Sequence, residues 1–381
     1  MMATGLALYI HVPFCLSKCY YCDFFSQPYC ANTINQYLGA LEQEARLYLT
    51  SWPYAQEVTS IYIGGGTPTV LTAEQLVNLL ELVSLFPRAG EAEWTVEANP
   101  DTLSREKLFI LREYGVNRLS LGVQSFDDQL LRFLGRTHTA AAAQSAWEQA
   151  RRLGFANMNL DLIFGIPGQS EDLWRQTIAR ALSLQPDHVS AYGLTIEPGT
   201  EFARRGLAAA DEELELAQYR TAQRLLERAG LIQYEISSFA RSGYTCQHNL
   251  VYWRNEPYLG LGPAAVSYLN KERRLNVNDI ASYVRLLKTG QPPIGDREQA
   301  TEELAQAETV ILALRLKEGL SRQRFRDRFG WDVTDIYPSE INHLLAYGLV
   351  TLDKESLRLT AAGWLLANQA AAAFLPDNPL Y

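Results

Sequence analysis

Short apolar runs and amphipathic stretches alternate along the first two thirds of the chain, and this alternation constrains the fold more than any other feature of the sequence. The runs are rich in β-branched and aromatic residues, and a helical pattern follows each of the first five. This order is typical of βα units that build a parallel sheet. The predicted strands are Leu6–Val12, Ser60–Ile63, Glu93–Glu97, Arg118–Leu121, Met158–Ile163 and His188–Tyr192, and the predicted helices lie near 33–50, 72–85, 104–114, 139–153 and 170–184.

Six units are too few for a closed eight-stranded barrel. The sequence therefore predicts an α/β fold in which residues 1–230 form a partial, open (β/α)6 barrel, with its functional residues at the carboxyl ends of the strands. Residues 231–295, rich in Gly, Asn, Tyr and Pro, would extend the barrel and end in a linker, Gly290–Asp296. Residues 296–381 would form a small α+β domain with the helices and β-ribbon of a winged helix.

The overall composition excludes several classes of protein. The chain carries 34 basic and 43 acidic residues, a net charge of −9, so it lacks the positive charge of a non-specific nucleic-acid binder. The winged-helix-like region is also acidic, and we expect no nucleic-acid partner. No apolar run reaches the roughly 18 residues of a membrane span, and no signal peptide is recognisable. Five cysteines without a disulfide pattern indicate a reduced, cytoplasmic protein.

Three of those cysteines, Cys15, Cys19 and Cys22, have the spacing C-x3-C-x2-C and follow the first predicted strand directly. Three thiolates are one ligand too few for a closed tetrahedral zinc site. A [4Fe–4S] cluster normally takes four thiolates, so three would leave one iron open, which is the mark of a catalytic centre. A zinc site completed by Cys30 is the alternative.

Polar residues stand at the ends of the next predicted strands. The glycine run Gly64–Gly66 follows the second strand, and glycines let the backbone approach a ligand closely, although a plain tight turn has the same composition. Glu97, Gln124 and Asp161 then end three apolar runs, and Arg136 adds a fixed cation. Each could be a satisfied core group, a helix cap or a surface residue, but together at one face of a barrel they favour a ligand site.

The segment Y-I-H-V-P-F-C-L-S-K-C-Y-Y-C-D-F, with an aromatic residue before the third cysteine, resembles the radical S-adenosylmethionine (SAM) superfamily. Within it the chain is similar to the oxygen-independent coproporphyrinogen III oxidases and to their relatives, the HemW haem chaperones. The resemblance implies a [4Fe–4S] cluster whose open iron binds SAM, and an electron donor such as a flavodoxin or ferredoxin. In the superfamily the reduced cluster cleaves SAM to a 5′-deoxyadenosyl radical.

The resemblance also implies which residues contact SAM. The glycine-rich turn would bind its ammonium group, and the polar strand ends would bind its ribose and carboxylate. The implied SAM contacts are Tyr9, Tyr21, Gly65, Gly66, Thr67, Glu97, Gln124, Arg136, Asp161 and Thr195, and the implied cluster ligands are Cys15, Cys19 and Cys22.

Two departures separate the chain from the oxidases and match the chaperones. The oxidases carry a fourth cysteine where this chain has Phe24, and they have an N-terminal extension, whereas only fourteen residues precede Cys15 here. A third feature, H-N-x-x-Y-W at 248–253, resembles a motif linked to haem binding in the chaperones. It makes His248 the candidate haem ligand, with Cys246 as an alternative and a purely structural histidine as another.

These resemblances predict a haem chaperone that binds haem and transfers it to client haem proteins. The alternative is an oxygen-independent coproporphyrinogen III oxidase, and a third hypothesis is radical chemistry on another tetrapyrrole. Phe24 argues against coproporphyrinogen dehydrogenase activity, and whether SAM is turned over is left open. A client resident in a membrane would bring the protein into peripheral contact with that membrane.

Overall fold

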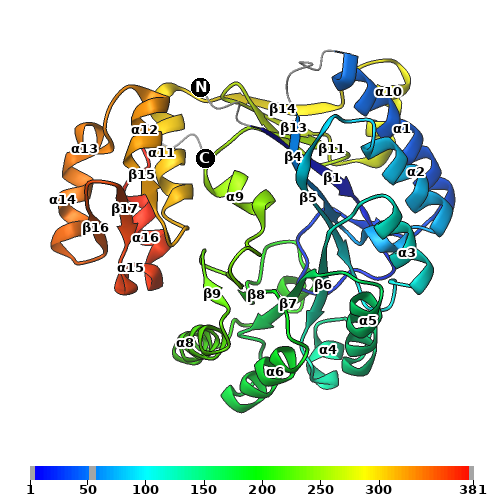
Figure 1. Ribbon diagram of the computed structural model, residues 1–381, viewed down its shortest axis with the longest axis horizontal. Helices are drawn as coiled ribbons and strands as arrows, with labels where there is room; N and C mark the ends of the chain where they lie inside the picture. The colour runs from blue at the N-terminus through cyan, green and yellow to red at the C-terminus, as the bar shows by residue number, and fades with distance from the viewer. Residues whose placement is uncertain (1–4, 51–56, 377–381) are drawn as a thin grey trace.

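The computed structural model describes residues 5–50 and 57–376, and a twisted sheet runs through most of it (Figure 1). The sheet has 12 strands in the order β14-β13-β12-β11-β1-β4-β5-β6-β7-β8-β10-β9. Six consecutive neighbours within it are parallel and form the predicted partial barrel: β1 (Leu6–Val12), β4 (Val58–Gly65), β5 (Arg88–Ala98), β6 (Arg118–Gln124), β7 (Asn157–Phe164) and β8 (His188–Gly193).

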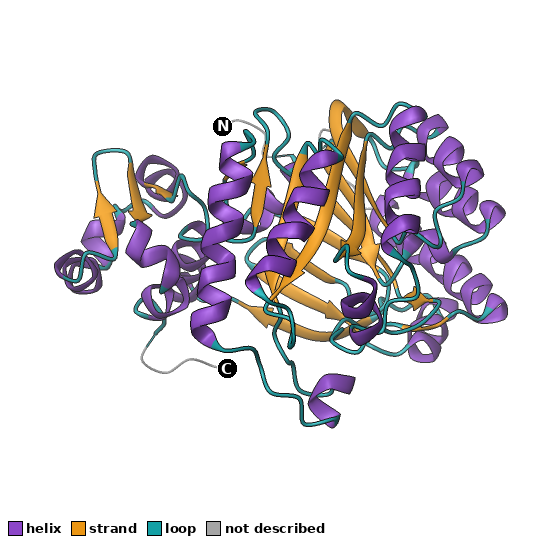
Figure 2. Ribbon diagram, turned by 90° about the horizontal axis from the view of Figure 1, so that it is seen from below, coloured by secondary structure: helices purple, strands orange, loops and turns teal. Residues whose placement is uncertain are grey.

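Helices cover the outer face of this barrel (Figure 2). Local signals start several of them: Thr72 forms a capping box with Gln75, and Ser104, Thr139 and Ser170 each accept a hydrogen bond from the first turn. The covering helices are α1 (Ala31–Thr50), α2 (Ala73–Val83), α3 (Arg105–Glu113), α5 (Ala140–Arg152), α6 (Glu171–Ser183) and α8 (Glu212–Arg228). All five helices predicted after the first five strands are therefore present, and α8 adds a sixth covering helix.

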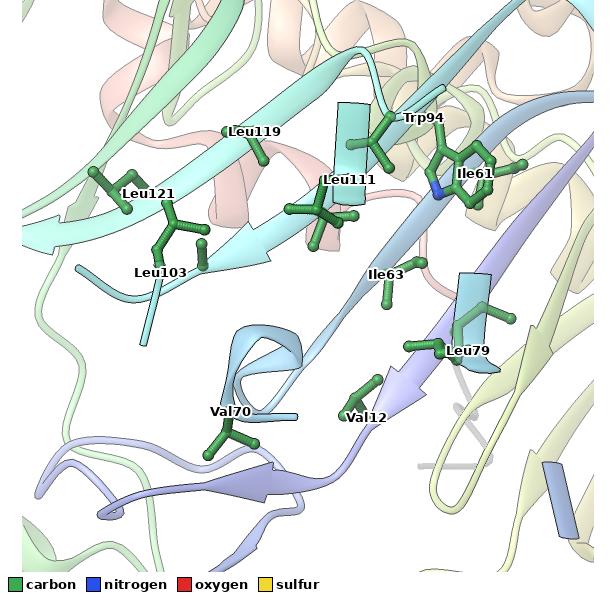
Figure 3. Close-up of a cluster of buried hydrophobic side chains, with 14 of the residues drawn as sticks. Val12, Ile61, Ile63, Val70, Leu79, Trp94, Leu103, Leu111, Leu119 and Leu121 are labelled. Carbon is green, nitrogen blue, oxygen red and sulfur yellow. The ribbon is translucent and has the colours of Figure 1, made fainter. Parts of the chain in front are cut away.

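Side chains alternate between the two faces of each parallel strand, and the outer positions are apolar. Ile61 and Ile63 of β4 and Leu119 and Leu121 of β6 pack with residues of α2 and α3 in the largest buried cluster (Figure 3). Full burial of one such side chain stabilises the fold by roughly 1.5–3 kcal/mol. The helices therefore hold the sheet from outside, which leaves the inner face to other side chains.

The inner positions of the same strands are polar. On neighbouring strands these side chains bond to one another, as Ser120 of β6 does to Asp161 of β7 at 3.0 Å. Buried polar groups need such partners because an unpaired one costs about 1–3 kcal/mol. The inner residues are Tyr9, His11, Ser60, Tyr62, Glu93, Thr95, Glu97, Arg118, Ser120, Asn159, Asp161, His188 and Ser190.

Beyond the six strands, the region that follows residue 230 extends the sheet at both edges. β9 (Ile232–Gln233) and β10 (Ser238–Ala240) continue it beside β8. β11 (Tyr258–Leu261) pairs in parallel with β1, and the antiparallel strands β12 (Val266–Leu269), β13 (Glu272–Asn276) and β14 (Ile294–Gln299) follow. The prediction that Gly290–Asp296 is a linker is wrong for its last three residues, because backbone pairing with β13 places them in the edge strand β14.

Two helices of this region contact the barrel. α9 (Gln247–Trp253) packs against β4, and α10 (Ile280–Lys288) packs against α1. Between α10 and α1, the buried carboxylate of Glu44 accepts hydrogen bonds from Gly262 N, Asn276 Nδ2 and Tyr283 OH. This one side chain therefore fixes the end of β11, the end of β13 and α10 on the barrel.

The C-terminal residues form a small α+β domain beside the barrel (Figure 1). It has its own buried cluster, which includes Leu314, Phe325 and Leu357, and a three-stranded antiparallel sheet in the order β15-β17-β16. Its elements are α11 (Glu302–Ala313), β15 (Leu320–Ser321), α12 (Arg322–Phe329), α13 (Val333–Ile336), α14 (Pro338–Ala346), β16 (Val350–Leu352), β17 (Ser356–Leu359), α15 (Ala361–Leu365) and α16 (Ala367–Ala372). Helices with a β-ribbon agree with the predicted winged-helix-like architecture. Within 5–50 and 57–376, every helix is too short or too polar to cross a bilayer.

Candidate functional site

The three clustered cysteines lie on a loop at the carboxyl end of β1. The short strands β2 (Phe14–Cys15) and β3 (Gln27–Pro28) pair in parallel and bring the two ends of the loop together. Inside the barrel, His11 Nε2 bonds to the Phe25 carbonyl oxygen at 2.9 Å, and His11 Nδ1 to the Tyr9 hydroxyl at 3.0 Å. Side chains of β1 thereby fix the position of the cysteine loop over the inside of the barrel.

The thiols of Cys15, Cys19 and Cys22 are free and partly buried. Burial, with the charges of Cys19 and Cys15, raises the pKa of the Cys22 thiol to about 11. Cys30, which the zinc alternative requires, is exposed, and its pKa is lowered by hydrogen bonds with Thr33. In the described residues, no three His, Cys, Asp or Glu side chains lie close enough together to hold a single metal ion.

The glycine-rich turn after β4 packs directly against the start of the cysteine loop. Gly66 N donates to the Val12 carbonyl oxygen at 2.9 Å, and Thr67 N donates to that of Phe14 at 2.7 Å. A Cβ atom on Gly66 would lie 2.6 Å from the Phe14 oxygen, and one on Gly65, whose φ is +101°, would lie 2.4 Å from the His11 ring. Only glycine fits at these two positions, so the close approach of turn and loop explains the composition.

Glu97, at the end of β5, faces the same turn. It accepts hydrogen bonds from Tyr62 OH at 2.7 Å and from Gly65 N at 3.2 Å. Burial and the charge of nearby Asp161 nevertheless raise the pKa of Glu97 to about 7. Tyr9 lies beside Tyr62, and burial together with the Glu97 charge raises the pKa of its hydroxyl.

Arg136 reaches the cysteine loop from the segment between α4 (Asp128–Phe133) and α5. Its Nη1 donates to Cys19 Sγ at 3.3 Å, and its Nη2 donates to the Gly122 oxygen and to Asn99 Oδ1, each at 2.6 Å. On the other side, Thr67 Oγ1 donates to Cys15 Sγ at 3.6 Å. Cys19 thus has a cationic donor and Cys15 a neutral one, and hydrogen bonds of this kind tune the thiolate ligands of iron–sulfur clusters.

Gln124 is the last residue of β6, whereas Asp161 lies in the middle of β7 and not at its end, because Leu162, Ile163 and Phe164 continue the pairing with β8. Gln124 is buried with φ of +65°, at an irregularity in the pairing of the two strands, and this strained backbone turns its side chain toward Arg136 and Asn99. Asp161 accepts from Ser120 and from Asn159 Nδ2 at 2.8 Å.

The remaining candidates from the SAM resemblance differ in their surroundings. Tyr21 packs at the edge of an apolar cluster, and burial raises the pKa of its hydroxyl while the charge of Arg136 lowers it. Thr195 is exposed in the loop after β8, beyond the bonded network.

His248 lies at the start of α9, inside the barrel, and is fully buried. Its Nδ1 bonds to Ser60 Oγ at 3.0 Å and its Nε2 to Tyr252 OH at 2.8 Å. Burial and the charge of Arg118 lower the pKa of the imidazole to about 3, so the ring is neutral. Both nitrogens are therefore engaged, and ligation of a haem iron by His248 would require Tyr252 or Ser60 to move. Cys246 is equally buried, and its thiol donates to Glu93 at 3.5 Å.

Sequence reasoning missed several polar residues that complete this site. Asn99 and Tyr62 are examples, each two positions from a residue already noted, Glu97 or Gly64. Side chains two apart share a face of a strand. Period-2 alternation therefore carried the signal, but the strands were interpreted as uniformly buried apolar runs.

Comparison with known proteins identifies two family models in the chain. The model described as the radical SAM superfamily matches residues 9–181, and the HemN C-terminal domain matches residues 301–366. A curated protein named "Heme chaperone HemW" from Bacillus subtilis (strain 168) is 40% identical, over 97% of this chain and 99% of the relative. The protein of the same name from Escherichia coli (strain K12) is 34% identical, over 98% of each chain.

A solved structure extends the similarity to both parts of the fold. Coproporphyrinogen III oxidase (HemN) from Escherichia coli, described as a radical SAM enzyme, matches with a TM-score of 0.85 and 26% identity, over 97% of this chain and 90% of that one. The chain therefore belongs to the radical SAM superfamily and, within it, to the family of the heme chaperone HemW.

Proposed function

We propose that this protein is a haem chaperone, which binds haem and transfers it to client haem proteins. The observation that carries the proposal is the similarity along nearly the whole chain to curated proteins named heme chaperone. Phe24 supports it, because the related oxidases have a cysteine at this position. The exposed fraction of Phe24 is 61%, so the loop presents an apolar ring to its surroundings where a fourth thiol would be.

The same site would hold a [4Fe–4S] cluster and SAM. Cys15, Cys19 and Cys22 would be the cluster ligands, and the open iron would bind the amino and carboxylate groups of SAM. Glu97 and Arg136 lie beside the glycine-rich turn and the cysteine loop with a carboxylate and a cation, which suit the ammonium and carboxylate groups of a zwitterionic amino acid. The proposed SAM contacts are Tyr9, Tyr21, Gly65, Gly66, Thr67, Glu97, Gln124, Arg136, Asp161 and Thr195.

Within this site the chain's own residues would bind SAM and orient it. Arg136 would keep its positive charge, because a guanidinium stays protonated in proteins. Glu97, with a pKa of about 7, would take up or release a proton near neutral pH. The proposed client is a haem protein. The proposed electron donor, if the cluster is reduced, is a low-potential redox protein such as a flavodoxin or ferredoxin.

The decisive experiment compares haem binding with porphyrinogen turnover on one anaerobically reconstituted preparation. We expect a Soret band on titration with haem, and no conversion of coproporphyrinogen III in the presence of SAM and a reductant. Replacement of Cys15, Cys19 and Cys22 by Ala should abolish the thiolate-to-iron absorbance. Steady conversion of coproporphyrinogen III at ordinary enzymatic rates would overturn the chaperone proposal.

The second candidate function is that of an oxygen-independent coproporphyrinogen III oxidase. The TM-score of 0.85 with the Escherichia coli oxidase favours it, since barrel and C-terminal domain both superpose. The turnover arm of the experiment above decides between the two functions. A Phe24→Cys variant that still fails to convert the porphyrinogen would show that more than the fourth cysteine separates them.

A further inference from the structure

Asn99 follows the end of β5 and lies between the two side chains that reach the cluster cysteines. Its Oδ1 accepts from Arg136 Nη2 at 2.6 Å, and its Nδ2 donates to Thr67 Oγ1 at 2.9 Å. Arg136 in turn donates to Cys19 Sγ, and Thr67 to Cys15 Sγ. One continuous chain of hydrogen bonds therefore connects two of the three clustered thiols through a single amide.

The direction of every bond in this chain is fixed by chemistry. A guanidinium has only donors, so the amide oxygen of Asn99 must face Arg136. Its NH2 group then faces Thr67, and the Thr67 hydroxyl must accept from it. The single proton of that hydroxyl is left to point at Cys15 Sγ. The orientation of the amide thus leaves the Thr67 hydroxyl to donate to Cys15 Sγ, while Arg136 can only donate to Cys19 Sγ.

Gly122 of β6 packs closely against both Asn99 and Arg136 and restricts their positions. Arg136 Nη2 also donates to the Gly122 carbonyl oxygen, so the guanidinium is held at two points besides sulfur. A Cβ atom on Gly122 would lie 3.0 Å from Asn99 Oδ1 and 3.2 Å from Arg136 Nη2. A side chain at position 122 would therefore press on the amide and the guanidinium together.

We propose that Asn99 is a positioning residue, which orients Thr67 and Arg136 so that both donate hydrogen bonds to the cluster cysteines. This inference rests on the proposed function, because it takes Cys15 and Cys19 as cluster ligands. Hydrogen bonds to the sulfurs are one of the factors that set the reduction potential of an iron–sulfur cluster. Donors favour the more negative, reduced state, so Asn99 raises the reduction potential.

Two substitutions test the two arms of the hydrogen-bond chain, one from Asn99 through Arg136 to Cys19 and one from Asn99 through Thr67 to Cys15. Asn99→Asp keeps an acceptor for Arg136 but has no donor for Thr67, so the Thr67 hydroxyl turns to the carboxylate and leaves Cys15. Asn99→Ala removes both arms. After anaerobic reconstitution, an EPR-monitored redox titration should show a lower reduction potential for both variants. We expect roughly a tenfold change in the reduction equilibrium, about 59 mV for one electron.

Asn117→Ala is the matched control, because Asn117, like Asn99, makes one hydrogen bond through its amide oxygen and one through its amide nitrogen. Both bonds of Asn117 are to the backbone of β5. Asn117 accepts from Trp94 N at 2.8 Å and donates to the Ala92 oxygen at 2.9 Å, far from the cysteine loop along the strand. This control should lose stability without any change in potential. Thr67→Val, which keeps the shape of the side chain but has no hydroxyl, should lower the potential in the same direction as Asn99→Asp.

The outcomes distinguish this inference from the proposed function. A wild-type chain that takes up no iron–sulfur cluster contradicts both. A wild-type chain with a cluster, and Asn99 variants with the potential of the Asn117→Ala control, contradicts the inference alone. Loss of the cluster in Asn99→Ala, with full iron content in Asn117→Ala, supports it, and the Thr67→Val potential then tests the arm to Cys15 by itself.

Discussion

Replacement of His248 by Ala should destabilise the fold, whatever it does to haem binding. The substitution leaves Ser60 Oγ and Tyr252 OH without their partner, and each orphaned group costs about 1–3 kcal/mol. It also removes ring contacts with Tyr62 and Tyr252, whose centroids lie 5.2 and 5.0 Å away. Each contact contributes about 0.5–1.5 kcal/mol. The sum is about 3–9 kcal/mol, which a urea unfolding curve resolves easily.

His188 provides a control with the same environment and no haem motif. It is also fully buried, with Nδ1 bonded to Asn159 and Nε2 to the Tyr234 hydroxyl. His188→Ala should therefore cost a similar free energy of unfolding and leave haem affinity unchanged. A large loss of haem affinity in both variants would be a consequence of destabilisation, whereas a loss confined to His248→Ala would support ligation.

Tyr252→Phe makes the test of ligation specific. If His248 ligates haem iron through Nε2, that atom must first give up its 2.8 Å bond to Tyr252 OH. Removing the hydroxyl removes this cost of about 1 kcal/mol, so haem should bind roughly fivefold more tightly in a Soret titration. Unchanged haem affinity in both His248→Ala and Tyr252→Phe would refute a role as ligand, and an unchanged urea midpoint in His248→Ala would refute the reasoning from buried hydrogen bonds.

Three further perturbations follow from the geometry. Burial raises the pKa of Glu44 to about 7, so the protonated carboxyl favours the folded state at low pH, and this contribution is lost as the pH rises through 7. Between pH 5 and 8 the free energy of unfolding of the wild type should therefore fall by about 3 kcal/mol more than that of Glu44→Gln. Parallel pH profiles of the two proteins would contradict this. Gly66→Ala should displace the cysteine loop by contact with Phe14, which lowers the free energy of unfolding by roughly 1–3 kcal/mol and the iron content after reconstitution. Gly39→Ala is the control, because open space surrounds Gly39 on α1, and it should leave the iron content unchanged. Arg118→Leu should cost about 3–5 kcal/mol in urea unfolding, because it leaves the buried carboxylate of Glu93 without its cation, and a cost below 1 kcal/mol would show that Glu93 is not held by that charge.

The fold was more predictable from the sequence than the interior of the barrel. Apolar runs followed by helical patterns identified the six strands of the partial barrel, because each strand buries an apolar outer face under helices. The strands β11 to β14 were missed because each has only four to six residues, and because the polar residues of β13 and the edge strand β14, such as Arg273 and Glu298, are typical of a loop. Their pairing depends on the neighbouring strand, which no local pattern encodes.

The candidate site shows the same limit at the level of single residues. Cysteine spacing and strand-end polarity pointed to the cysteine loop, Glu97 and Arg136, because those signals are local. The role of Asn99 depends on Thr67 and Arg136, which are 32 and 37 residues away along the chain. Only the pairing of β5 with β4 and β6 brings such residues together, so local sequence patterns do not rank Asn99 above any other asparagine in a loop.

The motif at 248–253 illustrates how one spacing admits two explanations. In a helix, residues four apart lie on one face, so the spacing of His248 and Tyr252 is what α9 requires for the hydroxyl to reach Nε2. Trp253, one position on, faces elsewhere and stacks under Arg315 of the C-terminal domain at 4.6 Å. Asn255 then bonds to Thr309 of α11. Residues 248–255 therefore join the barrel interior to the C-terminal domain.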